Sequence, residues 1–88
     1  MRVSFDSEVD AAYIALGDTP IGGGEVKTTV RSILTPGGSE INLDFDAAGR
    51  LLGLEVLNAT EVLPGPLLAG AEPPPFHADW WQQGTPEA

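Results

Sequence analysis

The sequence predicts a mainly all-β protein: a small antiparallel meander sheet of four or five strands with an irregular, proline-rich C-terminal tail. Apolar and polar residues alternate with a period of two over residues 41–57, as in half-buried strands. β-Branched residues fill residues 25–35. Six of the eight prolines fall in residues 64–88, where periodicity is weak. We therefore predict a β domain over residues 1–63 and an extension over residues 64–88.

The first two predicted strands span residues 2–6 and 11–17. Residues 7–16 permit two interpretations, because Ser7 and Asp10 resemble a helix-capping box and the apolar residues that follow have helical spacing. As a strand, the segment places three apolar side chains on one face: Ala12, Ile14 and Leu16. We favour the strand, since the segment is short for a stable helix.

The third strand, residues 25–35, follows a glycine-rich loop, and residues 40–46 and 51–57 form a hairpin. If the numbers of opposed residues sum to 97, apolar side chains meet three times: Phe45 and Leu52, Leu43 and Leu54, Ile41 and Val56. A sum of 96 suits a left-handed Gly49 but places Glu55 on the apolar face. An unpaired buried carboxylate costs several kcal/mol, so we predict the sum of 97 with Glu55 exposed.

One apolar face of this sheet needs to be covered. We predict that the core contains the following side chains: Val3, Phe5, Ile14, Leu16, Val30, Leu43, Phe45, Leu52, Leu54 and Val56. The chain has no cysteine, so it has neither disulfides nor thiolate metal sites. Because a small single sheet is marginally stable alone, we expect a homodimer whose sheets pack face to face or whose edge strands join.

The chain is acidic, with 13 acidic residues, four basic residues and a net charge of −9. Phosphate backbones repel such a chain, so direct nucleic-acid binding is not expected. The acidic residues either keep the domain soluble or complement a basic protein partner, and both interpretations stay open. No apolar run is long enough to span a membrane, and residues 1–6 do not resemble a signal peptide. We therefore expect a cytoplasmic protein without membrane contact.

Three carboxylates of the hairpin, Asp44, Asp46 and Glu55, are the candidates for chemistry. Grouped carboxylates can bind Ca²⁺ or Mg²⁺, and paired carboxylates hydrolyse glycosides. A structural role is favoured instead, since Asp6 and Asp46 can accept backbone hydrogen bonds in turns and Glu55 can pair with Arg50 or Arg31. We therefore predict no catalytic residue, no cofactor and no metal site.

Three aromatic residues of the tail, Phe76, Trp80 and Trp81, are the candidates for partner binding. They are too apolar for a simply solvated tail. We expect them to pack against the sheet or across a dimer. The alternatives are a linear motif that docks a partner and disorder.

Two segments resemble a short bacterial family catalogued only as domain of unknown function 2283. Residues 5–16 are similar to its opening pattern, aromatic-Asp-x-Glu-x-Asp-x-x-Tyr-Ile-x-Leu. Residues 43–57 are similar to its second half, Leu-Asp-aromatic-Asp-x-x-Gly-Arg-Leu-Val-Gly-Ile-Glu-Ile-Leu, and Asn58-Ala59 matches its usual ending. The resemblance implies a small antiparallel β domain without a known activity. It also implies an antitoxin-like role, because members are often encoded beside small basic toxin-like proteins.

These observations together predict a non-enzymatic protein-interaction domain, with an antitoxin-like, partner-neutralising role as its most specific form. The alternative is a small metal-binding or hydrolytic module that uses the surface carboxylates Asp44, Asp46 and Glu55. A protein partner would support the first hypothesis, and binding of Ca²⁺ or Mg²⁺ would support the second.

Overall fold

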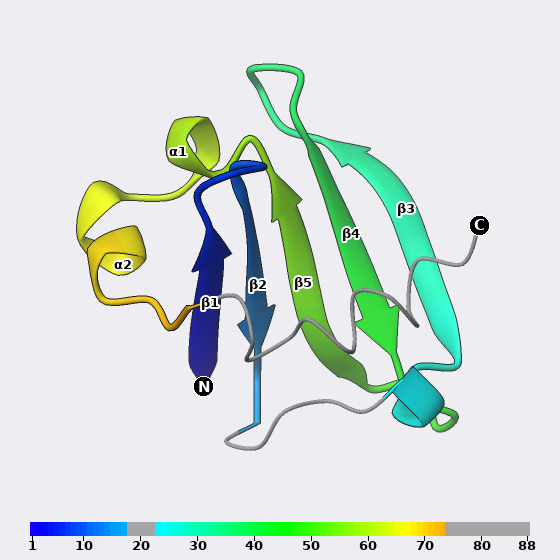
Figure 1. Cartoon of the computed structure of the whole chain (residues 1–88). Coiled ribbons are helices and arrows are strands. Elements are labelled where there is room, and N and C mark those ends of the chain that lie inside the picture. Colours follow the sequence, from blue (N-terminus) through cyan, green and yellow to red (C-terminus); the bar gives the residue numbers. More distant parts are fainter. Residues whose placement is uncertain (18–22, 74–88) are drawn as a thin grey trace.

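The computed structural model describes residues 1–17 and 23–73, which form one open, five-stranded antiparallel sheet and two short helices (Figure 1). The strands are β1 (Arg2–Asp6), β2 (Ala11–Ala15), β3 (Thr28–Leu34), β4 (Glu40–Phe45) and β5 (Leu51–Leu57). A 3-10 turn, Gly23–Glu25, precedes β3, and the helices α1 (Ala59–Val62) and α2 (Gly65–Ala69) follow β5. The prediction of a mainly β fold with antiparallel strands is confirmed.

The order of the strands in the sheet is β1-β2-β5-β4-β3. Because β2 pairs with β5 and not with β3, the meander prediction is wrong at this one connection. Residues 16–27 join the two strands and need to cross about three strand spacings of ~4.8 Å each. A segment of this length easily covers that distance at ~3.3 Å per residue. The connection is therefore long enough for β3 to lie at the far edge of the sheet and not next to β2.

The segment that permitted both a helix and a strand is a turn followed by β2 (Ala11–Ala15), which confirms the strand. Asp6 stabilises this turn, because its Oδ1 accepts a hydrogen bond of 2.9 Å from the backbone N–H of Glu8. The predicted structural role of Asp6 is thereby confirmed.

The β4–β5 hairpin confirms the predicted register over most of its length. Four pairs have residue numbers that sum to 97: Ile41 and Val56, Asn42 and Glu55, Leu43 and Leu54, Asp44 and Gly53. Phe45 pairs with Leu51 and not with Leu52, because the register shifts by one residue next to the turn. There Gly49 has the left-handed φ of 82°. The β-bulge therefore combines the preferred turn with the register that the apolar face requires.

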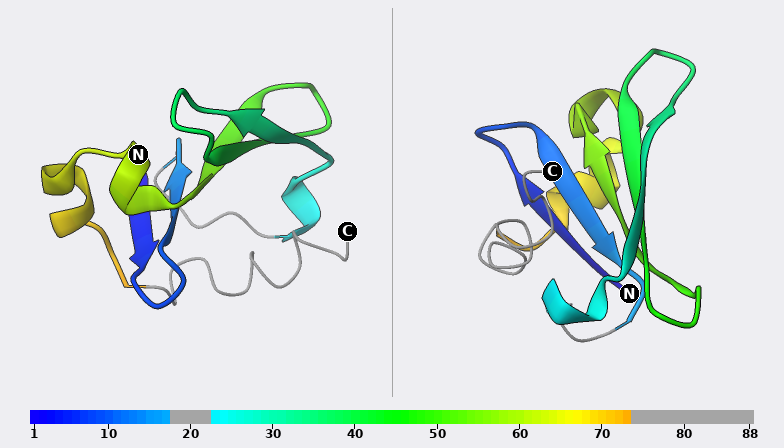
Figure 2. Two further views of the ribbon diagram at one scale, coloured as in Figure 1. Left: turned by 90° about the horizontal axis from the view of Figure 1, so that it is seen from above. Right: turned by 90° about the vertical axis from the view of Figure 1, so that its right-hand side faces the viewer.

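The core is smaller than predicted and lies under the two helices. Its centre consists of Ala12, Val56 and Ala59, against which the following side chains pack: Phe5, Ile14, Ile41, Val62, Leu63 and Leu68. Leu16 and Val30 were expected in the core but are 43% and 44% exposed. Val30 is exposed because α1 and α2 lie at the β1 side of the sheet, away from the middle of β3, as Figure 2 shows. Leu16 lies just beyond the last residue of β2, Ala15.

Helix α1 is held against the β1–β2 turn by Asp10. Its two carboxylate oxygens accept hydrogen bonds from the backbone N–H (3.0 Å) and the hydroxyl (2.7 Å) of Thr60. Its carbonyl oxygen accepts a hydrogen bond from the N–H of Ala59 at 2.9 Å. Asp10 therefore satisfies N–H groups that the first turn of a helix leaves unpaired.

Replacing Asp10 with alanine should lower the free energy of unfolding by about 1 kcal/mol, the usual cost of losing a helix cap. Thermal denaturation followed by circular dichroism should show a drop in Tm of several degrees. Asp10 has a φ of 55°, so the Asp10→Gly variant is the control, because glycine tolerates this φ without supplying a cap. If Asp10→Gly restored the full Tm, the loss would come from backbone strain and not from the cap.

The described part of the C-terminal extension extends the sheet beyond β1. The N–H of Glu72 donates to the carbonyl of Val3 at 2.7 Å, and the N–H of Phe5 donates to the carbonyl of Glu72 at 3.0 Å. The guanidinium of Arg2 forms an ion pair with the carboxylate of Glu72, with one contact of 2.7 Å. The edge of β1 is therefore partly covered. The domain boundary between residues 63 and 64 stays a prediction.

Candidate functional site

The polar face of the sheet carries a buried cluster of side chains, defined here as Tyr13, Thr29, Asn42, Asp44 and Glu55. Strand pairing brings them together, because Tyr13 lies opposite Glu55, Glu55 opposite Asn42, and Asp44 opposite Thr29. Tyr13 and Asp44 are 1% exposed, and Glu55 is 5% exposed. The prediction that Glu55 is exposed is therefore wrong, although the register from which it was derived is correct.

Hydrogen bonds explain how this polar cluster tolerates burial. The Asp44 carboxylate accepts one hydrogen bond from the Tyr13 hydroxyl at 3.0 Å and one from the Thr29 hydroxyl at 2.7 Å. The side-chain amide of Asn42 donates to Glu55 at 3.0 Å. Both carboxylates thus have partners, and burial no longer carries the cost of an unpaired group. Glu55 pairs with an amide and not with the predicted arginine.

Gly53 makes the contact between Tyr13 and Asp44 possible. Gly53 lies between the two residues in the sheet, opposite Asp44 on one side and Ala15 on the other. A Cβ atom at this position would lie 2.6 Å from Cζ of Tyr13 and 2.6 Å from the carbonyl oxygen of Ile14. The phenol ring therefore occupies the space that any side chain on residue 53 would need.

Burial shifts the protonation equilibria of the cluster. Desolvation raises the pKa of Asp44, although its hydrogen bonds with Thr29 and Tyr13 and the charge of Arg31 oppose the shift. Desolvation also raises the pKa of Glu55, while its bond with Asn42 opposes this. The pKa of Tyr13 rises well above its ordinary value, through burial and the nearby Asp44 charge. Tyr13 consequently remains a hydrogen-bond donor at every physiological pH.

The structure separates the three candidate metal ligands. Asp44 and Glu55 belong to the cluster, but Asp46 lies in the β4–β5 turn, where its Oδ1 accepts hydrogen bonds of 2.9 Å from the N–H groups of Ala48 and Arg50. The predicted turn-stabilising role of Asp46 is confirmed. Within residues 1–17 and 23–73, no three His, Cys, Asp or Glu side chains are grouped so that they could hold a metal ion.

The sequence pattern does not reveal the part that Tyr13 and Thr29 play in the cluster. Nothing in the alternation of apolar and polar residues distinguishes Tyr13 from an ordinary residue of a strand. The one available signal is Gly53, since a glycine inside a strand often marks a close approach by another group. Using that signal requires the β2–β5 pairing, which the predicted meander did not contain.

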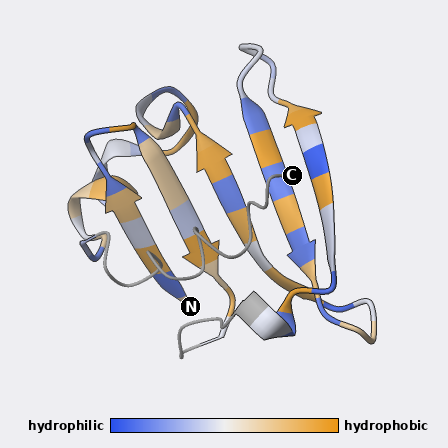
Figure 3. Ribbon diagram, turned by 45° about the vertical axis from the view of Figure 1, so that its right-hand side comes forward, coloured by the Kyte–Doolittle hydropathy of each residue, from blue (hydrophilic) through white to orange (hydrophobic). Residues whose placement is uncertain are grey.

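The outer edge of β3 is the most exposed apolar part of the described chain. Val30, Ile33 and Leu34 are 44%, 39% and 66% exposed, and β3 is the last strand of the sheet. Among the described residues no further strand pairs with it. Figure 3 shows the apolar residues along this strand. A β-bulge interrupts its pairing with β4 between Val30 and Ile33, and Ser32 has a φ of 61° there.

The predicted partner-binding residues Phe76, Trp80 and Trp81 lie outside the described residues. Their role stays a prediction. In the part of the chain that the structure does describe, no helix is long and apolar enough to cross a membrane.

Comparison with known proteins identifies one family and assigns no activity. No curated protein and no solved structure matches the chain. One family, described as "Protein of unknown function (DUF2283)", matches residues 2–59, which include all five strands and the whole buried cluster. Since this match covers more than half of the sequence and agrees with the predicted resemblance, the chain belongs to the DUF2283 family.

Proposed function

We propose that this chain is a non-enzymatic protein-interaction domain that binds a basic protein partner along the outer edge of β3. One observation carries the proposal: large apolar side chains are exposed on the last strand of an open sheet. The backbone groups of such an edge can pair with an extended segment of another protein, while neighbouring pockets and apolar side chains provide specificity.

The shape of the edge supports a specific partner. The bulge between Val30 and Ile33 divides β3 into two short stretches, and such irregularities prevent indiscriminate edge pairing. A partner segment has to follow this irregular edge in order to cover Val30, Ile33 and Leu34. Each of these side chains that becomes buried adds roughly 25 cal/mol per Å² of apolar surface removed from water.

The charge of the chain supports a basic partner. The net charge is −9, and such a field attracts a basic protein and accelerates the encounter. β3 itself carries no carboxylate and a single cation, Arg31. Long-range attraction would therefore come from the rest of the surface, while β3 supplies apolar and backbone contacts. An antitoxin-like role requires that binding blocks the activity of the partner. Binding would do so if the partner's active surface is the surface that this chain covers.

A homodimer is the alternative use of the same surface. The helices already cover the apolar face next to β1 and β2, so the need to hide the whole face in a dimer is smaller than the sequence indicated. Light scattering at micromolar concentration measures this directly. A dimer that becomes monomeric in the Ile33→Lys variant would place a second copy on β3 and contradict the proposal of a basic partner.

The proposal predicts that Ile33→Lys abolishes partner binding. Pull-down from the native host should capture a basic protein with the wild type and lose it with this variant, because a charge would be buried in the interface. With the captured protein purified, calorimetry should show at least a tenfold weaker affinity, or about 1.4 kcal/mol. Val9→Lys is the matched control, since Val9 is 60% exposed in the β1–β2 turn.

Three results would contradict this function. The first is equal partner binding by the Ile33→Lys variant and the wild type. The second is an equal loss of partner binding in the Val9→Lys variant, which would show that the added positive charge weakens binding wherever it lies on the surface. The third is the absence of a protein partner together with calorimetric binding of Ca²⁺ or Mg²⁺ by the chain. That result would favour the metal-binding alternative.

A further inference from the structure

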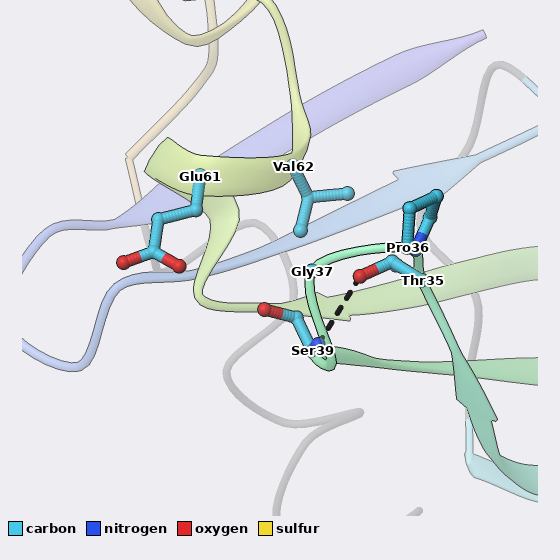
Figure 4. A pocket seen from close by; sticks show the side chains of 6 residues that line it. All are labelled: Thr35, Pro36, Gly37, Ser39, Glu61 and Val62. Carbon is cyan, nitrogen blue, oxygen red and sulfur yellow. Dashed lines mark hydrogen bonds between the residues drawn. The ribbon is translucent and has the colours of Figure 1, made fainter.

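An open pocket of about 300 Å³ lies between the β3–β4 loop and α1. Figure 4 shows the residues that line it: Thr35, Pro36, Gly37, Ser39, Glu61 and Val62. Its volume is at the lower end of the range of ligand pockets, about 300–1,000 Å³. Thr35 directly follows the last residue of β3, Leu34, so one wall of the pocket begins where β3 ends.

Hydrogen bonds hold the loop side of the pocket in one shape. The N–H of Thr35 donates to the carbonyl of Ser39 at 2.8 Å, and the N–H of Gly38 donates to the carbonyl of Thr35 at 2.9 Å. The N–H of Ser39 donates to the hydroxyl of Thr35 at 3.1 Å. The amide of Asn58, next to α1, donates to the Ser39 hydroxyl at 3.3 Å and joins the two walls. A pocket formed in advance costs little ordering on binding.

The chemistry of the lining favours a cationic side chain. Glu61 is the single charged residue among the lining residues, and within the described chain it takes part in no ion pair. Pro36 and Val62 supply apolar surface, and the hydroxyls of Thr35 and Ser39 supply polar contacts. Lysine and arginine combine an apolar stem with a charged end, which fits apolar walls with one carboxylate.

We infer that this pocket binds a lysine or arginine side chain of the partner, with the cation at Glu61 and the aliphatic stem against Pro36 and Val62. The inference rests on the proposed function, because it names a residue type by which a basic partner is recognised. A partner segment that pairs with β3 and continues past Leu34 would carry such a side chain to the pocket. The contact between this cation and Glu61 would then fix the position of the partner segment along β3.

The experiment is an NMR titration of the full chain with Nα-acetyl-arginine amide, with the neutral analogue Nα-acetyl-citrulline amide as the ligand control. We expect saturable shifts of the backbone amides of Gly37, Ser39, Glu61 and Val62 with the arginine probe. Glu61→Gln should weaken the apparent affinity about threefold to fivefold, as for a partly exposed ion pair. Glu8→Gln is the matched variant, since Glu8 is exposed outside the pocket, and it should leave the affinity unchanged.

Equal shifts with citrulline, shifts away from the pocket, or an unchanged affinity of Glu61→Gln would overturn the inference. Added salt should also weaken binding of the arginine probe, because an exposed ion pair is screened. The outcome is separable from the proposed function. If the pocket fails this test while Ile33→Lys abolishes partner binding, the edge of β3 remains the binding surface without a cation pocket. If only the pocket binds, the edge proposal falls.

Discussion

Replacing Gly53 with alanine should destabilise the fold by roughly 3 kcal/mol, the upper part of the usual range for overpacking a core. The added Cβ would collide with the Tyr13 ring, including its hydroxyl, and with the carbonyl oxygen of Ile14. Relief requires the ring to leave Asp44, or β2 and β5 to separate. Urea denaturation should show a lower midpoint, and Tm should fall by about 4–8 °C for each kcal/mol.

Gly37→Ala is the matched control for this prediction. Gly37 has no atom within 4 Å of an added Cβ, so the same substitution should leave stability within about 0.5 kcal/mol, as for other surface changes. A second test uses the Tyr13→Ala background, where the collision with the ring is absent. Gly53→Ala should cost less there, with only the contact to Ile14 remaining. Equal losses for Gly53→Ala and Gly37→Ala would contradict the packing that the structure shows.

The hairpin register was predictable because local patterns determine it. Ile41, Leu43, Leu54 and Val56 alternate regularly, and a one-residue slip would bring Glu55 onto their face. The bulge beside Phe45 was not predictable, since the turn with a left-handed Gly49 and the pairing of the apolar side chains each favour a different register, and the bulge satisfies both. Within the hairpin, the local sequence pattern was therefore sufficient to predict which residues pair, but not the bulge next to the turn.

The buried cluster was not predictable because it depends on contacts between distant segments. Tyr13 and Asp44 are 31 positions apart, and they meet only because β5 lies between β2 and β4. The alternating pattern also predicts that the polar side of a strand faces water. Here both sides of β5 are buried, since Val56 and Glu55 lie on opposite faces and both are inaccessible.

The residues that carry the family resemblance mostly have structural roles here. Side-chain hydrogen bonds or close backbone contacts account for the following: Asp6, Asp10, Tyr13, Asp44, Asp46, Gly53 and Glu55. A pattern that specifies turns, a helix cap and a buried cluster describes a fold rather than a reaction. The features proposed for binding, the β3 edge and the pocket at Glu61, lie largely outside the two resembling segments.

Lowering the pH from 7 towards 5 should raise the Tm of the protein. Burial raises the pKa of Asp44 and of Glu55 above their ordinary values of 3.8 and 4.5, so the folded state binds more protons than the unfolded state as the pH falls through the raised values. The stabilisation is complete below the ordinary values and is lost as the pH rises through the raised ones. Glu72 has the opposite effect on stability, since its hydrogen bond with Arg2 lowers its pKa below 4.5. The stabilisation by this ion pair is lost only when the pH falls through that lowered pKa.

The double variant Asp44→Asn/Glu55→Gln should flatten this pH dependence, because the two buried groups no longer titrate. The matched control is Glu8→Gln/Glu25→Gln, which removes the same number of charges from exposed positions. The control is needed because protonating any acidic residue of a chain with a charge of −9 also reduces repulsion in the folded state. Tm measured by differential scanning calorimetry between pH 5 and 7 should therefore keep its slope in the control and lose most of it in the buried variant. Equal slopes in the two variants would mean that general repulsion, and not the burial of Asp44 and Glu55, controls the response to pH.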